Sequence, residues 1–207
     1  KFGPMKKKMY LYFYLGKDSK GDHLERSRCQ IETGFDQSIW FRDGDKKCQD
    51  CTAFPSQHGY DPVKSQSSTK RRRNNTKFKL GDYSFFGAHY SDSVCFATNV
   101  NIKIPEFHFF LAERRATLQS IMFNAGCLIG LAQRHRGNDA HLFTSQLKEA
   151  GMIKKNLFSM SYHPEKHLFS RIFFGGVNTR YLGKAMYNLH YHPIVPSQSV
   201  WTVKMDQ

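Results

Sequence analysis

Short apolar runs rich in Tyr and Phe recur along the chain, and polar or glycine-containing segments separate them. The first run, Met9 to Leu15 (MYLYFYL), predicts a strand because it is short and aromatic. Residues 16–22 are polar and glycine-containing, which is typical of a turn. The next strand is expected to run through Cys29 into residues 32–34, and a further strand to begin at residues 38–41.

The middle of the chain predicts a long loop and then a hairpin. Residues 42–75 are polar, with prolines and a Ser-rich tract, so we expect mostly loop there. Lys77 to Tyr90 (KFKLGDYSFFGAHY) has two β-favouring arms around Gly81-Asp82, which is typical of a β-hairpin. Val94 to Ile104 alternates weakly between apolar and polar residues and predicts another strand.

The C-terminal half predicts one clear helix followed by short strands. Apolar residues form one side of this helix, namely Leu142, Phe143, Leu147 and Ala150. Asn138 or Asp139 is expected to cap its start, and Gly151 to end it. Strands are expected at residues 157–162, 171–174, 187–195 and 200–203. Together these patterns predict a mainly β single domain with one or two short helices.

The chain is strongly basic, with a formal net charge of +14 and a pI near 9.6. Such an excess favours an acidic partner, which could be nucleic acid, an anionic membrane surface or acidic protein surfaces in an assembly. Residues 1–8 form a basic leader, and the domain is expected to span residues 9–207. A candidate basic patch consists of Lys70, Arg71, Arg72, Arg73, Lys77 and Lys79. Because no nucleic-acid-binding module accompanies the charge, other protein subunits are the favoured partners.

The five cysteines leave the redox compartment open. Only Cys48 and Cys51 have suggestive spacing, and they fit either a small disulfide loop or two free thiols. A zinc site would need a second such pair, so neither a metal nor another cofactor is expected. No apolar run approaches the roughly 18 residues that a membrane-spanning helix requires, so no membrane span is expected.

A series of short motifs runs through the chain from residue 31 onwards. In order they are residues 31–40 (IETGFDQSIW), 48–51 (CQDC), 60–69 (YDPVKSQSST), 128–132 (LIGLA), 146–153 (QLKEAGMI) with 157–159 (LFS), 174–178 (FGGVN), 181–183 (YLG) and Trp201. Together they resemble the amino-terminal lobe of a pepsin-like aspartic protease. The resemblance implies a pepsin-like β-barrel lobe in which Glu32, Thr33 and Gly34 occupy the place of the family's first Asp-Thr-Gly.

The resemblance also implies a chemistry. In this family two aspartates, one from each lobe, share a proton, because two carboxylates so close together cannot both ionise. A hairpin flap carrying Tyr before Gly covers the cleft. Here Leu80 and Gly81 hold those flap positions, and Tyr83 would substitute if the register slipped. Trp40 matches the Trp of the catalytic stretch, and residues 48–51 match the family's small disulfide loop.

Several departures from the family pattern predict that catalysis is lost. Glu32 replaces the aspartate, and its extra methylene moves the carboxylate by about 1.5 Å. A misplacement of about 1 Å in a catalytic group can cost on the order of a hundredfold in rate. Phe35 and Asp36 stand where small serines normally surround the acid. Leu80 removes the flap phenol, and no second Asp-Thr-Gly occurs in the sequence. Asp36 is an alternative acid, but it lacks the Thr-Gly that shapes the turn.

These observations favour a catalytically inactive pseudo-protease that acts as a structural or binding subunit of a larger assembly. The first alternative is an active aspartic endopeptidase that needs a second lobe or dimerisation. The second alternative is an RNA-contacting subunit of a ribosome-like particle, using the basic leader and residues 70–73. The family resemblance implies the secretory pathway, whereas a repurposed subunit would fit an organelle assembly.

Overall fold

The computed structural model describes residues 9–24, 26–43, 59–71, 76–80, 83–115, 125–133, 141–161, 170–179, 190–195 and 201–204. The strands are β1 (Tyr10–Leu15), β2 (Arg26–Glu32), β3 (Ile39–Phe41), β4 (Thr69–Lys70), β5 (Thr76–Leu80), β6 (Tyr83–Phe96), β7 (Asn99–Arg115), β8 (Cys127–Gly130), β9 (Phe158–Ser161) and β10 (Arg171–Phe174). In this part of the chain the one helix is α1 (Phe143–Glu149). The prediction of a mainly β domain is confirmed.

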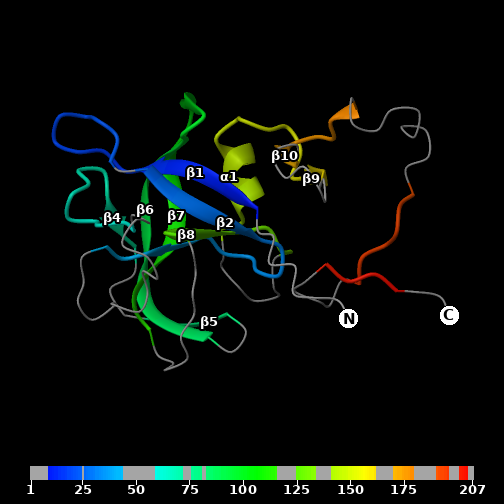
Figure 1. Cartoon of the computed structure of the whole chain (residues 1–207), viewed down its shortest axis with the longest axis horizontal. Helices are drawn as coiled ribbons and strands as arrows, with labels where there is room; N and C mark the ends of the chain where they lie inside the picture. Colours follow the sequence, from blue (N-terminus) through cyan, green and yellow to red (C-terminus); the bar gives the residue numbers. More distant parts are fainter. Residues whose placement is uncertain are drawn as a thin grey trace.

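Six strands close into a barrel in the order β1, β2, β8, β3, β7 and β6, and β6 pairs back with β1. β4 and β5 pair with β6 outside this closed ring. In Figure 1 the long strands β6 and β7 run the height of the barrel, and β5 lies at the lower end, away from β1. A closed ring satisfies the backbone groups of its strands without an open edge. The expected pepsin-like β-barrel lobe is therefore present.

Aromatic rings fill the barrel, which explains the abundance of Phe in its strands. Trp40 is fully buried, and its ring packs edge-on against those of Phe13, Phe107 and Phe109, with centroids 6.5, 5.6 and 5.3 Å away. Phe143 brings α1 into the same cluster, 5.9 Å from Phe107. Edge-to-face pairs at these distances add stabilisation beyond the area that they bury. The helix is therefore held mainly by its apolar side.

Gln146 of α1 adds a polar anchor to this contact. Its side chain is buried, and its Oε1 accepts a hydrogen bond from the backbone N–H of His108 at 2.6 Å. Its Nε2 donates to the carbonyl oxygens of His108 and His141, both at 3.0 Å. One amide thus satisfies three backbone groups and links α1 to β7, as a buried polar side chain must do to be tolerated.

Several predicted boundaries are wrong. The helix starts later than Asn138 or Asp139 would allow, because Phe143 enters the core and Leu142 takes the N-cap position without a side-chain cap bond. Its predicted end at Gly151 is confirmed, with a φ of 73° that favours glycine. The single strand predicted from Val94 to Ile104 is wrong, because β6 ends at Phe96 and β7 begins at Asn99 after a turn; β7 then continues as far as Arg115.

The C-terminal strands were only partly predicted. β9 and β10 form a separate two-stranded sheet close to residues 157–162 and 171–174 as expected. Residues 187–195 and 200–203 were expected to be strands, but their described parts contain only one isolated bridge, between Ile194 and Val203. In these described parts the bridge is accompanied by a backbone hydrogen bond from Val195 N–H to the carbonyl of Thr202 at 2.9 Å.

A buried carboxylate fixes the polar segment 59–71 to the barrel. Asp92 of β6 is only 2% exposed, and it accepts hydrogen bonds from the hydroxyl of Tyr60 and from Ser67 Oγ, both at 2.5 Å. It also accepts from the backbone N–H of Ser93 at 2.7 Å. Burial raises the pKa of Tyr60, and the neighbouring Asp92 raises it further, so the phenol stays a donor. The negative charge is thus offset by several donors.

Candidate functional site

The candidate acid, Glu32, ends β2 where that strand meets β8. β8 lies between β2 and β3, parallel to the first and antiparallel to the second, and Glu32 is opposite Gly130. The carbonyl of Glu32 accepts a hydrogen bond from the backbone N–H of Leu131 at 2.8 Å. This pairing positions the acid at the end of a strand. The exposed residues Thr33 and Gly34 follow and begin the turn.

The carboxylate of Glu32 is directed onto its own strand and turn. Its Oε1 accepts from the backbone N–H of Gly34 and its Oε2 from Gln30 Nε2, both at 3.4 Å. These are long hydrogen bonds to neutral donors, so they contribute little to holding the carboxylate in one orientation.

The loop between β2 and β3 is pressed against Gly130. A Cβ atom on Gly130 would overlap the backbone of Gln37 and the carbonyl of Phe35. Phe35 has no polar side-chain atom and Asp36 is buried, so neither offers an open carboxylate or hydroxyl next to Glu32. Asp36, the alternative acid, is therefore enclosed. The glycine permits the close crossing that holds the Glu32 turn in place.

β5 and β6 form a hairpin where the flap is predicted. Leu80 pairs with Tyr83, which leaves Gly81 and Asp82 as the connecting residues, in agreement with the predicted turn. Gly81 and Asp82 lie outside the described residues. The register pairs Leu80 with Tyr83 across the turn. The assignment of Leu80 and Gly81 to the flap positions stays a prediction.

Trp40 lies in the core and has no direct contact with solvent. Within the described residues its Nε1 has no hydrogen-bond acceptor. A buried N–H without a partner costs about 1–3 kcal/mol, so the packing of the ring must compensate.

An open cavity of about 920 Å³ borders the candidate turn. Thr33 and Leu131 line one side of it, and Phe143 and Phe158 line another. Trp201 is 46% exposed at this cavity, and its Nε1 donates to the carbonyl of Leu131 at 2.9 Å. The C-terminal segment is thereby held close to the acid position, although the two are far apart in sequence.

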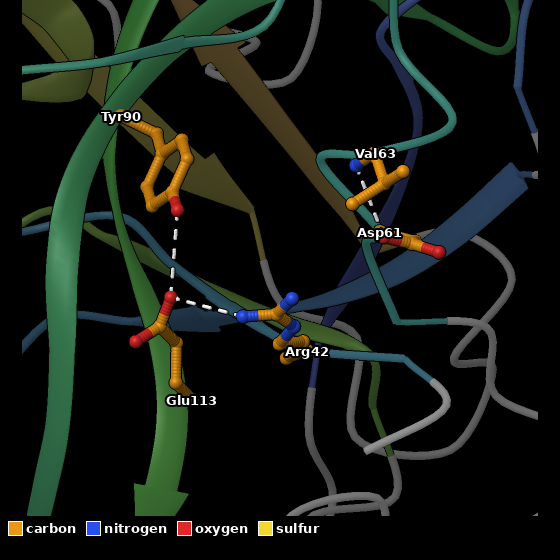
Figure 2. Close-up of polar contacts among 5 residues, drawn as sticks. All are labelled: Arg42, Asp61, Val63, Tyr90 and Glu113. Carbon is orange, nitrogen blue, oxygen red and sulfur yellow. Dashed lines mark hydrogen bonds and ion pairs between the residues drawn. The ribbon is translucent and has the colours of Figure 1, made fainter.

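A charged pair fixes the end of β3 to β7. Arg42 Nη1 lies 3.1 Å from Glu113 Oε1, and the hydroxyl of Tyr90 donates to the same oxygen at 3.4 Å (Figure 2). Burial raises the pKa of Tyr90, and Glu113 adds to the effect. The same view shows Asp61 accepting from the backbone N–H of Val63, which closes the turn of the YDPV motif. These contacts support the scaffold and are not arranged around Glu32.

The described basic-patch residues lie along one edge of β6. Lys70 and Arg71 are next to Tyr90 and Ser91, and Lys77 and Lys79 are exposed on β5. Arg71 is already paired, since it donates to Ser91 Oγ and forms an ion pair with Glu106. Arg72 and Arg73 lie outside the described residues. The predicted patch therefore contains at least one cation whose charge is offset within the protein.

Sequence reasoning missed the disulfide between Cys29 and Cys127. The available signal was Cys127 itself, which stands where the resemblance leads one to expect glycine, just before LIGLA. The predicted pair Cys48 and Cys51 lies outside the described residues.

Among the described residues, no three His, Cys, Asp or Glu side chains are grouped so as to hold a metal ion.

Comparison with known proteins agrees with this geometry. The model of the family described as eukaryotic aspartyl protease matches residues 25–207. Candidapepsin from Candida tropicalis is 28% identical over 172 residues, which cover 79% of this chain and 41% of the relative. The chain thus spans about two fifths of that relative's length.

No helix in the described part of the chain is long and apolar enough to cross a membrane.

Proposed function

The chain belongs to the eukaryotic aspartyl protease family, and from this premise we propose that it is a pseudo-protease, a pepsin-like scaffold that binds other proteins instead of hydrolysing them. The observation that carries the proposal is the acid position. Glu32 replaces aspartate there, and its carboxylate folds back toward Gly34 and Gln30. The side chain is one methylene longer than that of aspartate, so its carboxylate is displaced from the position in which an acid would share a proton with a second carboxylate.

The surroundings of Glu32 support the same proposal. Phe35 and Asp36 are buried in the loop beside it, where small hydroxyl side chains would be needed to orient a carboxylate. The flap position carries Leu80, which has no hydroxyl to donate. Each change removes a part of the hydrogen-bonded shell on which precise placement of the acid depends.

A binding role fits the rest of the surface. The half-exposed Trp201 beside an open cavity is a typical feature of protein contact sites, where aromatic residues are enriched. The net charge of +14 favours an acidic partner. The buried disulfide between Cys29 and Cys127 favours an oxidising compartment, and hence the secretory route, because cytosolic thiols are kept reduced.

The rival proposal is an active endopeptidase in which Glu32 works with an acid from a second lobe or a second copy. The intact turn and its hydrogen bond to Leu131 favour it, because the backbone that would present the acid is in place. Proteolysis of a denatured protein substrate at acid pH, with and without pepstatin, separates the two. We expect no pepstatin-sensitive cleavage. Cleavage that pepstatin blocks and Glu32→Gln abolishes would overturn the pseudo-protease.

A further inference from the structure

The open cavity beside the candidate turn has mostly apolar walls, and its volume is about 920 Å³. Segments far apart in the sequence supply these walls. They include Leu131 after β8, Leu142 before α1, Phe158 at the start of β9, and the C-terminal residues Ile194 and Trp201. Cavities of this size, with apolar and aromatic walls and a few polar groups, are typical binding sites for small molecules. We refer to this cavity as the Trp201 cavity.

The Trp201 cavity has a buried inner wall and an exposed mouth. Leu131 and Phe143 on the inner wall are only 3% and 1% exposed. At the mouth Trp201 is 46% exposed and Ile194 is 37% exposed. The indole ring is fixed there, because its N–H donates to the carbonyl of Leu131 and Phe158 packs edge-on against it at 5.6 Å. An ordered aromatic ring beside an apolar hollow favours an occupant with an apolar body.

The cavity also has polar groups in its lining. Gln133 lines it, and Gln133 Nε2 is a buried donor that has no hydrogen-bond acceptor within the described residues. Thr33 and Thr144, which carry hydroxyl groups, line it as well. A buried N–H without an acceptor is unfavourable, so an occupant that brings an oxygen acceptor within reach of Gln133 would be stabilised.

Lysines flank the residues that line the cavity. Lys154 and Lys155 directly precede the lining residue Asn156, and Lys204 follows Trp201 by three positions. All three lysines are exposed, and none of them forms an ion pair in the part of the chain that the structure describes. Their long side chains can therefore turn toward a negative group at the mouth of the cavity.

We propose that the Trp201 cavity binds a small amphiphile with an apolar body and one carboxylate. The apolar body lies against Trp201 and the inner wall, and the carboxylate lies on the side of Lys154 and Lys155. Glu32 is next to the lining residue Thr33, so repulsion between like charges keeps the carboxylate away from that wall. This inference goes beyond the proposed function and does not rest on it, because it holds whether or not Glu32 supports hydrolysis.

The size and chemistry of the cavity select this class of occupant for its interior. One side chain of a partner protein would leave most of the 920 Å³ unfilled, and apolar walls without contacting atoms lose dispersion energy. The exposed lysines disfavour a cationic amphiphile. A purely apolar molecule would leave Gln133 Nε2 without an acceptor.

Tryptophan fluorescence tests this proposal with the full chain and decanoate, below the concentration at which decanoate forms micelles. The chain has two tryptophans, and Trp40 is buried in the core, so a blue shift of the emission on binding reports Trp201. We expect a saturable blue shift with decanoate. Decylamine, with the same chain length and the opposite charge, should bind at least about fivefold more weakly. Trp201→Phe should lose the shift, while calorimetry still detects decanoate binding within about threefold of the unaltered chain.

A charge placed at the mouth tests the position of the ligand. Ile194→Glu puts a carboxylate beside the apolar wall and should weaken decanoate binding at least about tenfold. The matched control is Val63→Glu, which makes the same change at a 79% exposed position that does not line the cavity. The control should bind decanoate within about twofold of the unaltered chain.

The role of the lysines is tested by reversing their charge. Lys154→Glu combined with Lys155→Glu should weaken decanoate binding at least about fivefold. The matched control is Lys77→Glu combined with Lys79→Glu on β5, which Figure 1 shows apart from β9. This control should weaken binding less than about twofold.

Four results would overturn the proposal: no saturable binding of decanoate, equal binding of decylamine, an unchanged blue shift in Trp201→Phe, or equal losses in a cavity variant and its control. If circular dichroism shows that a cavity variant is unfolded, Lys204→Glu, at an exposed position, decides by the criterion set for the lysines. The pepstatin assay measures hydrolysis, so its result is independent of these measurements.

Discussion

Cys29 of β2 and Cys127 of β8 lie directly opposite each other and are joined by a disulfide in the buried wall of the barrel. The same two strands end with Glu32 opposite Gly130, so the bond ties together the strands that present the candidate acid turn. It also joins residues 98 positions apart, which makes it a long-range constraint on the unfolded chain.

Removal of this disulfide should strongly destabilise the fold. We expect Cys29→Ala with Cys127→Ala to lower the free energy of unfolding by about 2–5 kcal/mol, as is typical when a native disulfide is lost. Urea denaturation measures the effect. The unaltered chain in reducing buffer should show the same loss, and an unchanged urea midpoint under reducing conditions would contradict the prediction.

The hydrogen bond from Tyr60 to Asp92 should contribute to stability beyond the area that the ring buries. Tyr60→Phe keeps the ring but removes one donor from a buried carboxylate, so we expect a loss of about 1.5–3 kcal/mol in the free energy of unfolding. Tyr12→Phe on the barrel surface is the control and should change it by less than about 0.5 kcal/mol. If the two substitutions lower the free energy of unfolding equally, the hydrogen bond to Asp92 does not contribute to stability as predicted.

The strands of this protein were easier to predict than its polar anchors. The runs that became β1, β9 and β10 and the hairpin of β5 and β6 are recognisable because pattern and turn residues act locally. Asp92 and Gln146 are polar residues in apolar surroundings, and only the tertiary fold supplies their partners. The same holds for Cys29, whose partner is known only once β8 is placed between β2 and β3.

The candidate acid shows the same limit at closer range. The motif around Glu32 predicted its place at the end of a strand, because the order of residues is enough to recognise that turn. The direction of its side chain, toward Gly34 and Gln30, is not given by the order of residues in the motif, although both partners are only two positions away.

The free energy of unfolding should decrease by a small amount as the pH falls below neutral, because of His108. Burial lowers the pKa of His108, and the adjacent His141, stacked at 4.0 Å, and Arg71 lower it further. The folded chain therefore resists protonation that the unfolded chain accepts near pH 6.5. The free energy of unfolding should decrease from about pH 6.5 down to the lowered pKa and then level off, by less than about 1 kcal/mol because the ring is partly solvated.

Urea denaturation between pH 7.5 and pH 5.5 measures this effect. This range lies above the ordinary carboxylate pKa of about 4, so most carboxylates do not titrate within it. His108→Gln should flatten the decrease, because the backbone bonds of residue 108 to Gln146 do not need the ring. His190→Gln, at an exposed position, should leave the decrease unchanged. The assignment to His108 is wrong if both variants keep the full pH dependence.

Gly130 should tolerate no side chain, because the β2–β3 loop crosses directly over it. In Gly130→Ala the added methyl would overlap the backbone of Gln37 and Phe35, so the loop must move away from β8. We expect a loss of about 1–3 kcal/mol in the free energy of unfolding, the usual cost of overpacking. Gly176→Ala is the matched control, since nothing lies within 4 Å of a Cβ there, and its stability should stay within about 0.5 kcal/mol of the unaltered chain. If Gly130→Ala unfolds at the same urea concentration as the control, the loop is not pressed against β8, and the fixed position of the Glu32 turn would need another explanation.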